Sequence, residues 1–506
     1  MNVQGMLMRA ICIVALVTFL SPMLNVCTAQ QKEERSPSRA VSQSDDSMAN
    51  RIATRLLSAL VETNGVPGMG AAIWRKDRLV WSGSAGYRDA ERKQPVDQNT
   101  IFRLASVSKL FAATATARLM EQGSLDVNTP VQRIVRYLPD RWPAISTAQL
   151  AAHTSGIPHY QAVDQNRGGR AFASVREAVG VFQDRDLLFP PGERYSYSSY
   201  GYTLLSAVVE EVSGLSYLEY LSRHLTSGLI IGRDATDTVD PNASKAYEFV
   251  DGAIRGAAPH DYSYGWGGAG LGATAPDLAK FGGRVLTGQI ISRATFEWML
   301  LPAYLADGLP VVDTDRTPGG TATTIGLGWR SVRDIDGARI AHHSGVTNGA
   351  RSTLVLYPDR ALAVSLLSNA LWVSAIEQTA IMLAAPFAST ELAEHAACPT
   401  DAVAFDGLFN GQPVSGSAKV VDQNGLCTAE ISVRNTFGAW LNGFPQNDAE
   451  SLKLIGVETR GGFSRAALVT PIGIYDLRLQ DGGNRYLAML GGTRTISINF
   501  RPADSP

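Results

Sequence analysis

The sequence predicts an α/β protein in which helices flank an antiparallel sheet, followed by a small all-β domain. Two apolar runs joined by the polar turn 75–78 predict a hairpin, and further strands are expected within 339–367. Segments with helical apolar spacing lie between them. After about Ala397 this periodicity fades, and short alternating segments separated by glycine turns appear. The chain is therefore predicted to consist of a larger domain, 48–396, and a C-terminal β domain, 397–506.

The first 47 residues are predicted to be a signal peptide and a linker. Arg9 precedes an apolar run, and small residues end at Ala29, which predicts cleavage of a 1–29 signal peptide and export to the periplasm or the medium. A lipoprotein acylation site at Cys27 is an alternative that its preceding residues fit poorly. The run is too short for a comfortable membrane span, and an uncleaved anchor stays a further alternative. Residues 30–47 are polar and charged, which indicates a flexible linker.

The elements of the larger domain follow from the spacing of apolar residues and from the residues that begin or end helices. Apolar side chains recur at helical spacing over 48–64, and Gly65 closes that helix. Gly214 ends another helix, and Pro276 marks the start of a third. The predicted helices span 48–64, about 106–120, 202–212, 277–286 and 375–384, and the predicted strands span 69–74, 79–86, 339–343, 352–357 and 361–367.

The composition excludes several classes of function. The chain has 506 residues, 45% of them hydrophobic, and a net charge of −2, so it can bury a large core but has no basic footprint for nucleic acid. No cysteine and histidine spacing suggests a zinc site, and no cofactor is predicted. Cys398 and Cys427 are expected to form a disulfide in the exported chain, the alternative being two unpaired buried thiols.

Ser106 and Lys109 form the most informative pair in the chain. They lie three residues apart at the start of an apolar run, so on a helix the amine can reach the hydroxyl. A serine hydroxyl becomes a good nucleophile only when a nearby group takes its proton, and a lysine held neutral by burial can do so. Because a single Ser-x-x-Lys often arises by chance, its interpretation depends on the segments that follow.

A second polar segment, 190–205, carries several tyrosines and serines. Its Pro-Gly turn leads a loop directly onto a helix. A phenol held beside Ser106 and Lys109 would be more acidic next to the cation, so it could take and return a proton. The alternative is an aromatic loop that only packs on the core.

A third segment, 342–349, has the sequence His-His-Ser-Gly-Val-Thr-Asn-Gly and is expected at the end of a strand. Gly345 would let a substrate approach the backbone closely. An edge strand here could pair with an extended substrate and supply one N–H of an oxyanion hole, the group of donors that stabilises a negatively charged reaction intermediate. The alternative is a hairpin turn with an incidental histidine.

These three segments, in this order, resemble the motifs of the penicillin-binding-protein and class C β-lactamase-like family of serine hydrolases. The family pattern is Ser-x-x-Lys, then Tyr-x-Asn, then Lys-Thr-Gly or His-Thr/Ser-Gly. Segments 150–157 and 268–278 are similar to family segments as well. The resemblance covers about residues 50–390, and within 195–221 it is closest to the mitochondrial serine β-lactamase-like proteins, which are described as proteases that can form filaments.

The resemblance implies roles for individual residues. Ser106 would be the acylated nucleophile, and Lys109 and Tyr197 would share proton transfer. The backbone N–H groups of Ser106 and Val346 would form the oxyanion hole. The strand that binds substrate would be lined by His343, Ser344 and Gly345.

The resemblance also implies parts of the fold. An all-helical subdomain is expected between Ser106 and about Asp261, with the site at its junction with the sheet. His153 would be structural and would brace a loop beneath the site.

Two departures from the family pattern bear on the substrate. Ser199 stands where the family usually has asparagine, and its short side chain cannot offer an amide N–H to a substrate carbonyl. His343 stands where penicillin-active members usually have lysine, and a histidine is largely uncharged at neutral pH. Both departures weaken the case for binding the carboxylate of a β-lactam and favour an ester or a peptide.

Three functional hypotheses follow. The first is an exported hydrolase that acts on an ester or a peptide, and the second is a β-lactamase or D-alanyl-D-alanine carboxypeptidase. The third is a non-catalytic protein that binds a ligand or forms filaments, which the presence of Ser106, Lys109 and Tyr197 together disfavours. The chain has no Gly-x-Ser-x-Gly, so the nucleophile turn of α/β-hydrolases is not supported. The expected partner is a small-molecule or peptide substrate, and the oligomeric state is left open.

Overall fold

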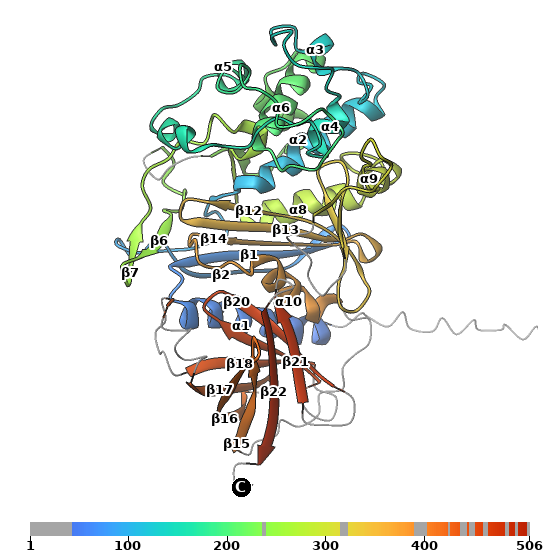
Figure 1. The fold of residues 1–506 in the computed structure, drawn as a ribbon. Helices are drawn as coiled ribbons and strands as arrows, with labels where there is room; N and C mark the ends of the chain where they lie inside the picture. Colours follow the sequence, from blue (N-terminus) through green and yellow to red (C-terminus); the bar gives the residue numbers. More distant parts are fainter. Residues whose placement is uncertain are drawn as a thin grey trace, which may run out of the picture. The chain divides into compact units, whose positions relative to one another are not determined.

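A computed structural model describes residues 43–234, 239–313, 322–388, 402–423, 426–435, 443–444, 451–458, 464–480, 485–490 and 494–502 (Figure 1). The predicted signal peptide, most of the predicted linker and Cys398 lie outside these residues. The first described helix, α1 (Gln43–Asn64), begins inside the segment predicted as a linker and ends where the sequence predicts.

An antiparallel sheet forms the centre of the larger domain. Among the described residues it has nine strands in the order β3-β2-β1-β14-β13-β12-β11-β10-β9, so the N-terminal hairpin pairs with strands from the far end of the domain. The strands are β1 (Gly68–Arg75), β2 (Arg78–Asp89), β3 (Gln94–Pro95), β9 (Val312–Asp313), β10 (Thr323–Ile325), β11 (Arg330–Arg333), β12 (Arg339–Thr347), β13 (Ala350–Tyr357) and β14 (Leu362–Ser368). This arrangement confirms the predicted fold class.

Alternation along the strands builds one core on each face of the sheet. In β1, Ala71 and Ile73 pack into the core that contains α1 and α10 (Ile376–Ala388). Ala72 between them packs into the opposite core, which contains α8 (Ala275–Leu286). Figure 1 shows α8 along one face of the sheet and α1 and α10 along the other. Because both faces are covered, the central strands β1, β13 and β14 are buried along most of their length.

The region between Ser106 and Asp261 is mainly helical, but the prediction of an all-helical subdomain is wrong. It contains the three short strands β5, β6 and β7. β5 pairs with β8, a strand that follows the region, and β6 and β7 pair with each other as a hairpin. The elements around the site are β4 (Phe102–Arg103), η1 (Ala105–Val107), α2 (Ser108–Glu121), α3 (Val131–Ile134), α4 (Thr147–Ala151), η2 (Ala162–Gly169), α5 (Val175–Val179), α6 (Ser199–Ser213), α7 (Tyr217–His224), β5 (Ile231–Arg233), β6 (Tyr247–Val250), β7 (Ala253–Gly256), η3 (Trp266–Gly268), β8 (Leu271–Ala273) and α9 (Arg293–Leu300).

A closed β-barrel forms the C-terminal part of the chain, which confirms the predicted all-β domain. Side chains at alternate positions, such as Phe405 and Phe409, fill its interior. Cys427 is disulfide-bonded and buried in the same core, while its predicted partner is not among the described residues. The barrel strands are β15 (Ala402–Phe409), β16 (Gln412–Gln423), β17 (Leu426–Asn435), β18 (Ser451–Glu458), β19 (Arg465–Thr470), β20 (Gly473–Leu479), β21 (Arg485–Leu490) and β22 (Arg494–Pro502). In the described part of the chain, no helix combines the length and apolar character needed to cross a membrane.

Candidate active site

Ser106 lies in the short 3-10 turn η1, directly before α2. The sequence places this serine within the helix, whereas α2 begins two residues later at Ser108. The turn depends on Ala105, whose φ of +46° puts a residue with a side chain in the left-handed region. Such a backbone is strained and persists only where the surrounding structure holds it. The strain at Ala105 therefore marks the place where the chain presents Ser106.

Lys109 is fully buried and contacts Ser106, as the spacing predicts. Its Nζ lies 3.2 Å from Ser106 Oγ, 2.9 Å from Ser199 Oγ and 2.7 Å from the carbonyl oxygen of Gly268. A carbonyl oxygen can only accept, so one N–H of the amine points at Gly268. If a second N–H goes to Ser199, the lone pair of a neutral amine faces the Ser106 hydroxyl. The three contacts thus suit a lysine that accepts the proton of Ser106 in its neutral form, whereas in its charged form it acts on the neighbouring groups as a cation.

Tyr197 lies beside this pair, in the loop that enters α6. Burial alone would raise the pKa of its phenol, but the positive charges of Lys109 and Arg330, and hydrogen bonds with Lys109 and Ser106, bring that pKa below its ordinary value. Lys109 Nζ is also 4.7 Å from the centre of the tyrosine ring. An alcohol, an amine and a phenol from two distant segments therefore meet at one point, which makes Tyr197 a second group able to move a proton.

His153 holds the loop that carries Tyr197. Its Nδ1 accepts a hydrogen bond from the backbone N–H of Ser198 at 3.1 Å, and its ring lies 4.4 Å from that of Tyr197. Ser198 in turn caps α6 by accepting a hydrogen bond from the N–H of Gly201. This geometry agrees with the bracing role expected for His153.

The Ser199 side chain points away from the cavity. It is buried, its Oγ contacts Lys109, and it is not among the residues that line the cavity. Its backbone N–H donates to Nδ1 of His159 at 3.2 Å. At the family's asparagine position the chain therefore has a residue that orients two others instead of one that faces the substrate.

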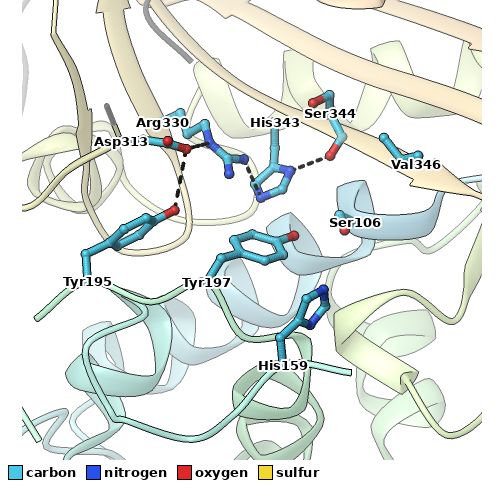
Figure 2. A pocket seen from close by; sticks show the side chains of 9 residues that line it. All are labelled: Ser106, His159, Tyr195, Tyr197, Asp313, Arg330, His343, Ser344 and Val346. Atoms are coloured by element: carbon cyan, nitrogen blue, oxygen red, sulfur yellow. Dashed lines mark hydrogen bonds and ion pairs between the residues drawn. The ribbon is translucent and has the colours of Figure 1, made fainter. Parts of the chain in front are cut away.

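Arg330 and Asp313 place an ion pair at the back of the cavity (Figure 2). Arg330 Nε lies 3.2 Å from Asp313 Oδ2, and both side chains are almost fully buried. Arg330 Nη1 donates to Nε2 of His343 at 2.9 Å, and Nδ1 of that histidine donates to the carbonyl oxygen of Ser344 at 2.7 Å. Burial, Arg330 and Lys109 hold the pKa of His343 well below its usual range, so this imidazole is neutral.

Part of β12 is left open on the side of the site. β11 pairs with it only over residues 339–342, and no described strand pairs with that edge over residues 343–347. The sequence predicts that the strand ends near His343, but it continues to Thr347 because β13 pairs along its whole length through a tight turn at Asn348 and Gly349. The open edge can therefore pair with an extended substrate.

Gly345 allows a close approach, but the group that approaches is the protein's own backbone. A Cβ at this position would overlap the carbonyl oxygen of Leu104, the Ser352 hydroxyl and the Ala105 side chain. Ser352 Oγ also donates to the Leu104 carbonyl at 2.6 Å. This glycine therefore sets the distance between β12 and the turn that carries Ser106, and its expected role in admitting substrate to the strand edge stays a prediction.

A cavity of about 310 Å³ opens over these groups, a size suited to a small molecule or the end of a peptide. The lining residues are Ser106, His159, Tyr195, Tyr197, Asp313, Arg330, His343, Ser344 and Val346. Figure 2 shows Ser106 and Val346 together at one end, and Tyr195 and Asp313 at the other. Among the described residues, no group of three or more histidine, cysteine or acidic side chains is placed to hold a metal ion.

Sequence reasoning missed four of the lining residues: His159, Tyr195, Asp313 and Arg330. Arg330 and Asp313 belong to no spaced motif and meet only through the pairing of β9, β10 and β11. His159 lies two residues after the 150–157 segment that carries the family resemblance, so its position was the one available signal. The site residues that the sequence did predict all lie at the cavity or directly behind it. They are Ser106, Lys109, Tyr197, Ser199, His343, Ser344, Gly345 and Val346.

Comparisons with known proteins agree with this geometry. The sequence model of the family described as Beta-lactamase matches residues 53–384. The serine beta-lactamase-like protein LACTB, mitochondrial, of Homo sapiens is 26% identical over 388 residues, which cover 60% of this chain and 71% of that protein. Penicillin-binding protein 4* of Bacillus subtilis is 27% identical over 309 residues, covering 58% of this chain and 65% of that protein. The crystal structure of a penicillin-binding protein from Bacillus halodurans shares the fold with a TM-score of 0.53 at 24% identity, covering 62% of this chain and 94% of that one.

Fold and site together define a serine hydrolase with a Ser-x-x-Lys motif, the type of enzyme that forms an acyl intermediate. The chain belongs to the β-lactamase family. The matched residues contain the sheet and the helical region, and the barrel lies outside them.

Proposed function

We propose that this protein is an exported hydrolase that forms an acyl-enzyme at Ser106 on an ester or a peptide substrate. The observation that carries the proposal is the contact between Lys109 Nζ and Ser106 Oγ at 3.2 Å, with Tyr197 beside both, at the floor of an open cavity. A purely structural pair would need neither the buried amine nor the cavity above it.

In the first step, Ser106 Oγ attacks the carbonyl carbon of the substrate while its proton passes to the Lys109 and Tyr197 pair. The carbonyl oxygen becomes negative and is stabilised by the backbone N–H groups of Ser106 and Val346. When the intermediate collapses, the bond to the leaving group breaks, and the alcohol or amine departs with the proton that the pair returns. The product of this step is an ester between the acyl group and Ser106.

In the second step, water attacks the acyl-enzyme. The same pair takes a proton from the water and returns it to Ser106 Oγ as the ester bond breaks. The acid leaves, and the site regains its starting protonation state. One proton-transfer pair therefore serves both halves of the reaction.

The side chains around the cavity favour an ester or a peptide over a β-lactam. A β-lactam carries a carboxylate that needs an accessible cation or donor. Arg330 is only 4% exposed and already pairs with the Asp313 carboxylate, and His343 is neutral. Binding a substrate carboxylate there would require desolvating it without a free partner.

Labelling with a fluorophosphonate, followed by mass spectrometry, tests whether Ser106 is a nucleophile without assuming a substrate. We expect a label on the Ser106 peptide in the wild type, none in Ser106→Ala, and full labelling in the control variant Ser213→Ala at the end of α6. Rates with p-nitrophenyl esters, peptide p-nitroanilides and nitrocefin then separate the substrate classes. Nitrocefin turnover faster than that of any ester or anilide would favour the β-lactamase alternative.

Export is part of the proposal and has its own test. The sequence supports it through the predicted signal peptide, so the intact mass of the protein from the periplasm or medium should correspond to a chain beginning at Gln30. A chain found only inside the cell with its first 29 residues would contradict it. Absence of fluorophosphonate labelling, together with filaments in electron micrographs, would favour the scaffold alternative.

A further inference from the structure

His159 stands at the rim of the cavity, in a position that the hydrolytic steps above do not use. It lines the cavity together with Ser106 and Tyr197 (Figure 2). The residue itself is exposed, so a ligand in the cavity can reach its ring.

One contact decides which nitrogen of His159 carries the hydrogen. The backbone N–H of Ser199 donates to Nδ1 of His159 at 3.2 Å. A nitrogen that accepts a hydrogen bond is unprotonated, and a neutral imidazole carries one hydrogen, so the hydrogen is on Nε2. Desolvation and the charge of Lys109 lower the pKa of His159 to about 4, which keeps the ring neutral at the pH of the reaction. Nε2 is thus a neutral N–H donor.

Packing fixes the direction of this donor. The ring of His159 stacks on Tyr160 with centres 4.6 Å apart and meets Tyr197 edge-on at 5.3 Å. Figure 2 shows the imidazole directed toward Ser106, on the far side of the cavity from the β12 residues His343 and Ser344. Among the described residues, none accepts a hydrogen bond from Nε2.

We propose that His159 is a specificity-determining residue whose Nε2–H binds a carbonyl oxygen in the acyl part of the substrate, in place of the amide that Ser199 lacks. The inference rests on the proposed function and narrows it to acyl groups that carry an amide or a similar uncharged acceptor, as the acyl half of a peptide does. An extended acyl group on the open edge of β12 exposes backbone groups on both sides, and His159 faces the side that β12 does not reach. A neutral donor suits an uncharged carbonyl better than a carboxylate. This preference agrees with the pairing of Arg330 with Asp313, which leaves that cation unavailable to a substrate carboxylate.

Two esters of equal chain length measure this interaction. The p-nitrophenyl ester of N-acetylglycine carries the acyl amide, and p-nitrophenyl valerate lacks it. The readout is kcat/KM for the N-acetylglycine ester divided by kcat/KM for the valerate ester. This ratio is measured in the wild type, His159→Phe, His159→Gln and His224→Phe. Phenylalanine keeps the ring against Tyr160 and Tyr197 but removes both nitrogens, whereas glutamine restores an N–H donor.

In His159→Phe the ratio should fall about tenfold, the usual effect of losing one neutral hydrogen bond that leaves a substrate carbonyl unpaired. His159→Gln should recover most of the loss. His224→Phe, an exposed histidine on α7, should stay within about twofold of the wild type. An equal fall in kcat/KM for both esters in His159→Phe would overturn the inference, since it would indicate a packing role. Wild-type kcat/KM for both esters in this variant would overturn it as well.

The labelling experiment separates this result from failure of the proposed function. If the wild type is not labelled by fluorophosphonate at Ser106, the proposed function fails. If the wild type is labelled but shows no preference for the N-acetylglycine ester over the valerate ester, the hydrolase stands and the role of His159 is contradicted.

Discussion

Gly345 of β12 packs directly against the carbonyl oxygen of Leu104, two residues before Ser106. No side chain fits between them, so the distance between strand and turn is fixed by backbone contact. The Ser106 and Val346 N–H groups belong to these two segments, and their separation therefore depends on a residue that carries no functional group.

Replacing Gly345 with alanine should push the Ser106 turn away from β12. We expect a loss of about 1–3 kcal/mol in the free energy of unfolding, because the added methyl meets rigid backbone. Fluorophosphonate labelling of Ser106 should slow by about tenfold or more, since the two N–H groups separate.

The control is Gly232→Ala in β5, where a Cβ would meet nothing within 4 Å. It should change the free energy of unfolding by less than about 0.5 kcal/mol. Wild-type labelling by Gly345→Ala would show that the contact does not position the nucleophile.

Lys109→Met should remove the proton acceptor while nearly preserving the shape of the side chain. The expected result is a fall in kcat by about 10²–10⁴, the usual contribution of a general base. Lys280→Met, on α8 and away from the cavity, should retain wild-type kcat. A Lys109→Met enzyme with kcat within tenfold of wild type would leave Tyr197 as the sole acceptor and contradict the shared role.

The rate should depend on pH through Tyr197. Burial raises the pKa of this phenol, and the charges of Lys109 and Arg330, together with hydrogen bonds with Lys109 and Ser106, more than offset that effect, so the pKa lies below its ordinary value of 10.0. If Tyr197 must be ionised to accept a proton, kcat/KM should increase as the pH rises through this lowered pKa and level off before pH 10. Removing a nearby positive charge raises the pKa, so the rising limb should move to higher pH.

The double variant Arg330→Gln and Asp313→Asn tests this shift without leaving an unpaired charge in the interior. Arg333→Gln, an exposed arginine on the same strand, serves as the control and should keep the wild-type profile. If the double variant also keeps that profile, Arg330 does not act on Tyr197.

The barrel contains a buried ion pair whose loss should be costly. Arg465 and Asp476 form two hydrogen bonds of 2.9 Å, with side chains only 8% and 6% exposed. Asp476→Asn would leave part of a buried positive charge uncompensated, and urea unfolding should show a loss of about 3–5 kcal/mol. Asp406→Asn, which removes the half-exposed partner of Arg501, should cost less than about 1 kcal/mol. Equal effects of the two variants would contradict the difference in burial.

The parts of the fold that the sequence predicts well are those with strong local signals. The helix closed by Gly214, the hairpin near the N-terminus and the strands around residue 355 are found close to their predicted bounds. The same holds for the meeting of Ser106 with Lys109, because a spacing of three residues brings side chains together within one turn. Tyr197 could be assigned only through the family resemblance, since nothing in its own segment indicates a distant partner.

What escaped prediction depends on contacts between segments far apart in the chain. Arg330 reaches the site because of strand pairing, and His159 because the N–H of a residue in α6 fixes its ring. The packing of Gly345 against the Ser106 turn was not predicted, because a glycine in a strand indicates that some group comes close but not which group it is. The three short strands within the helical region are stabilised by pairing that their few residues do not signal.

The left-handed turn at Ala105 places opposing demands on a single residue. A glycine there would adopt the same backbone without strain and should make the folded protein about 1 kcal/mol more stable. It would also let the neighbouring serine swing through a wider arc, so fewer encounters with a substrate would find it aimed at the carbonyl. Under selection for thermal stability, a change at this alanine would therefore gain stability at the expense of the turnover rate.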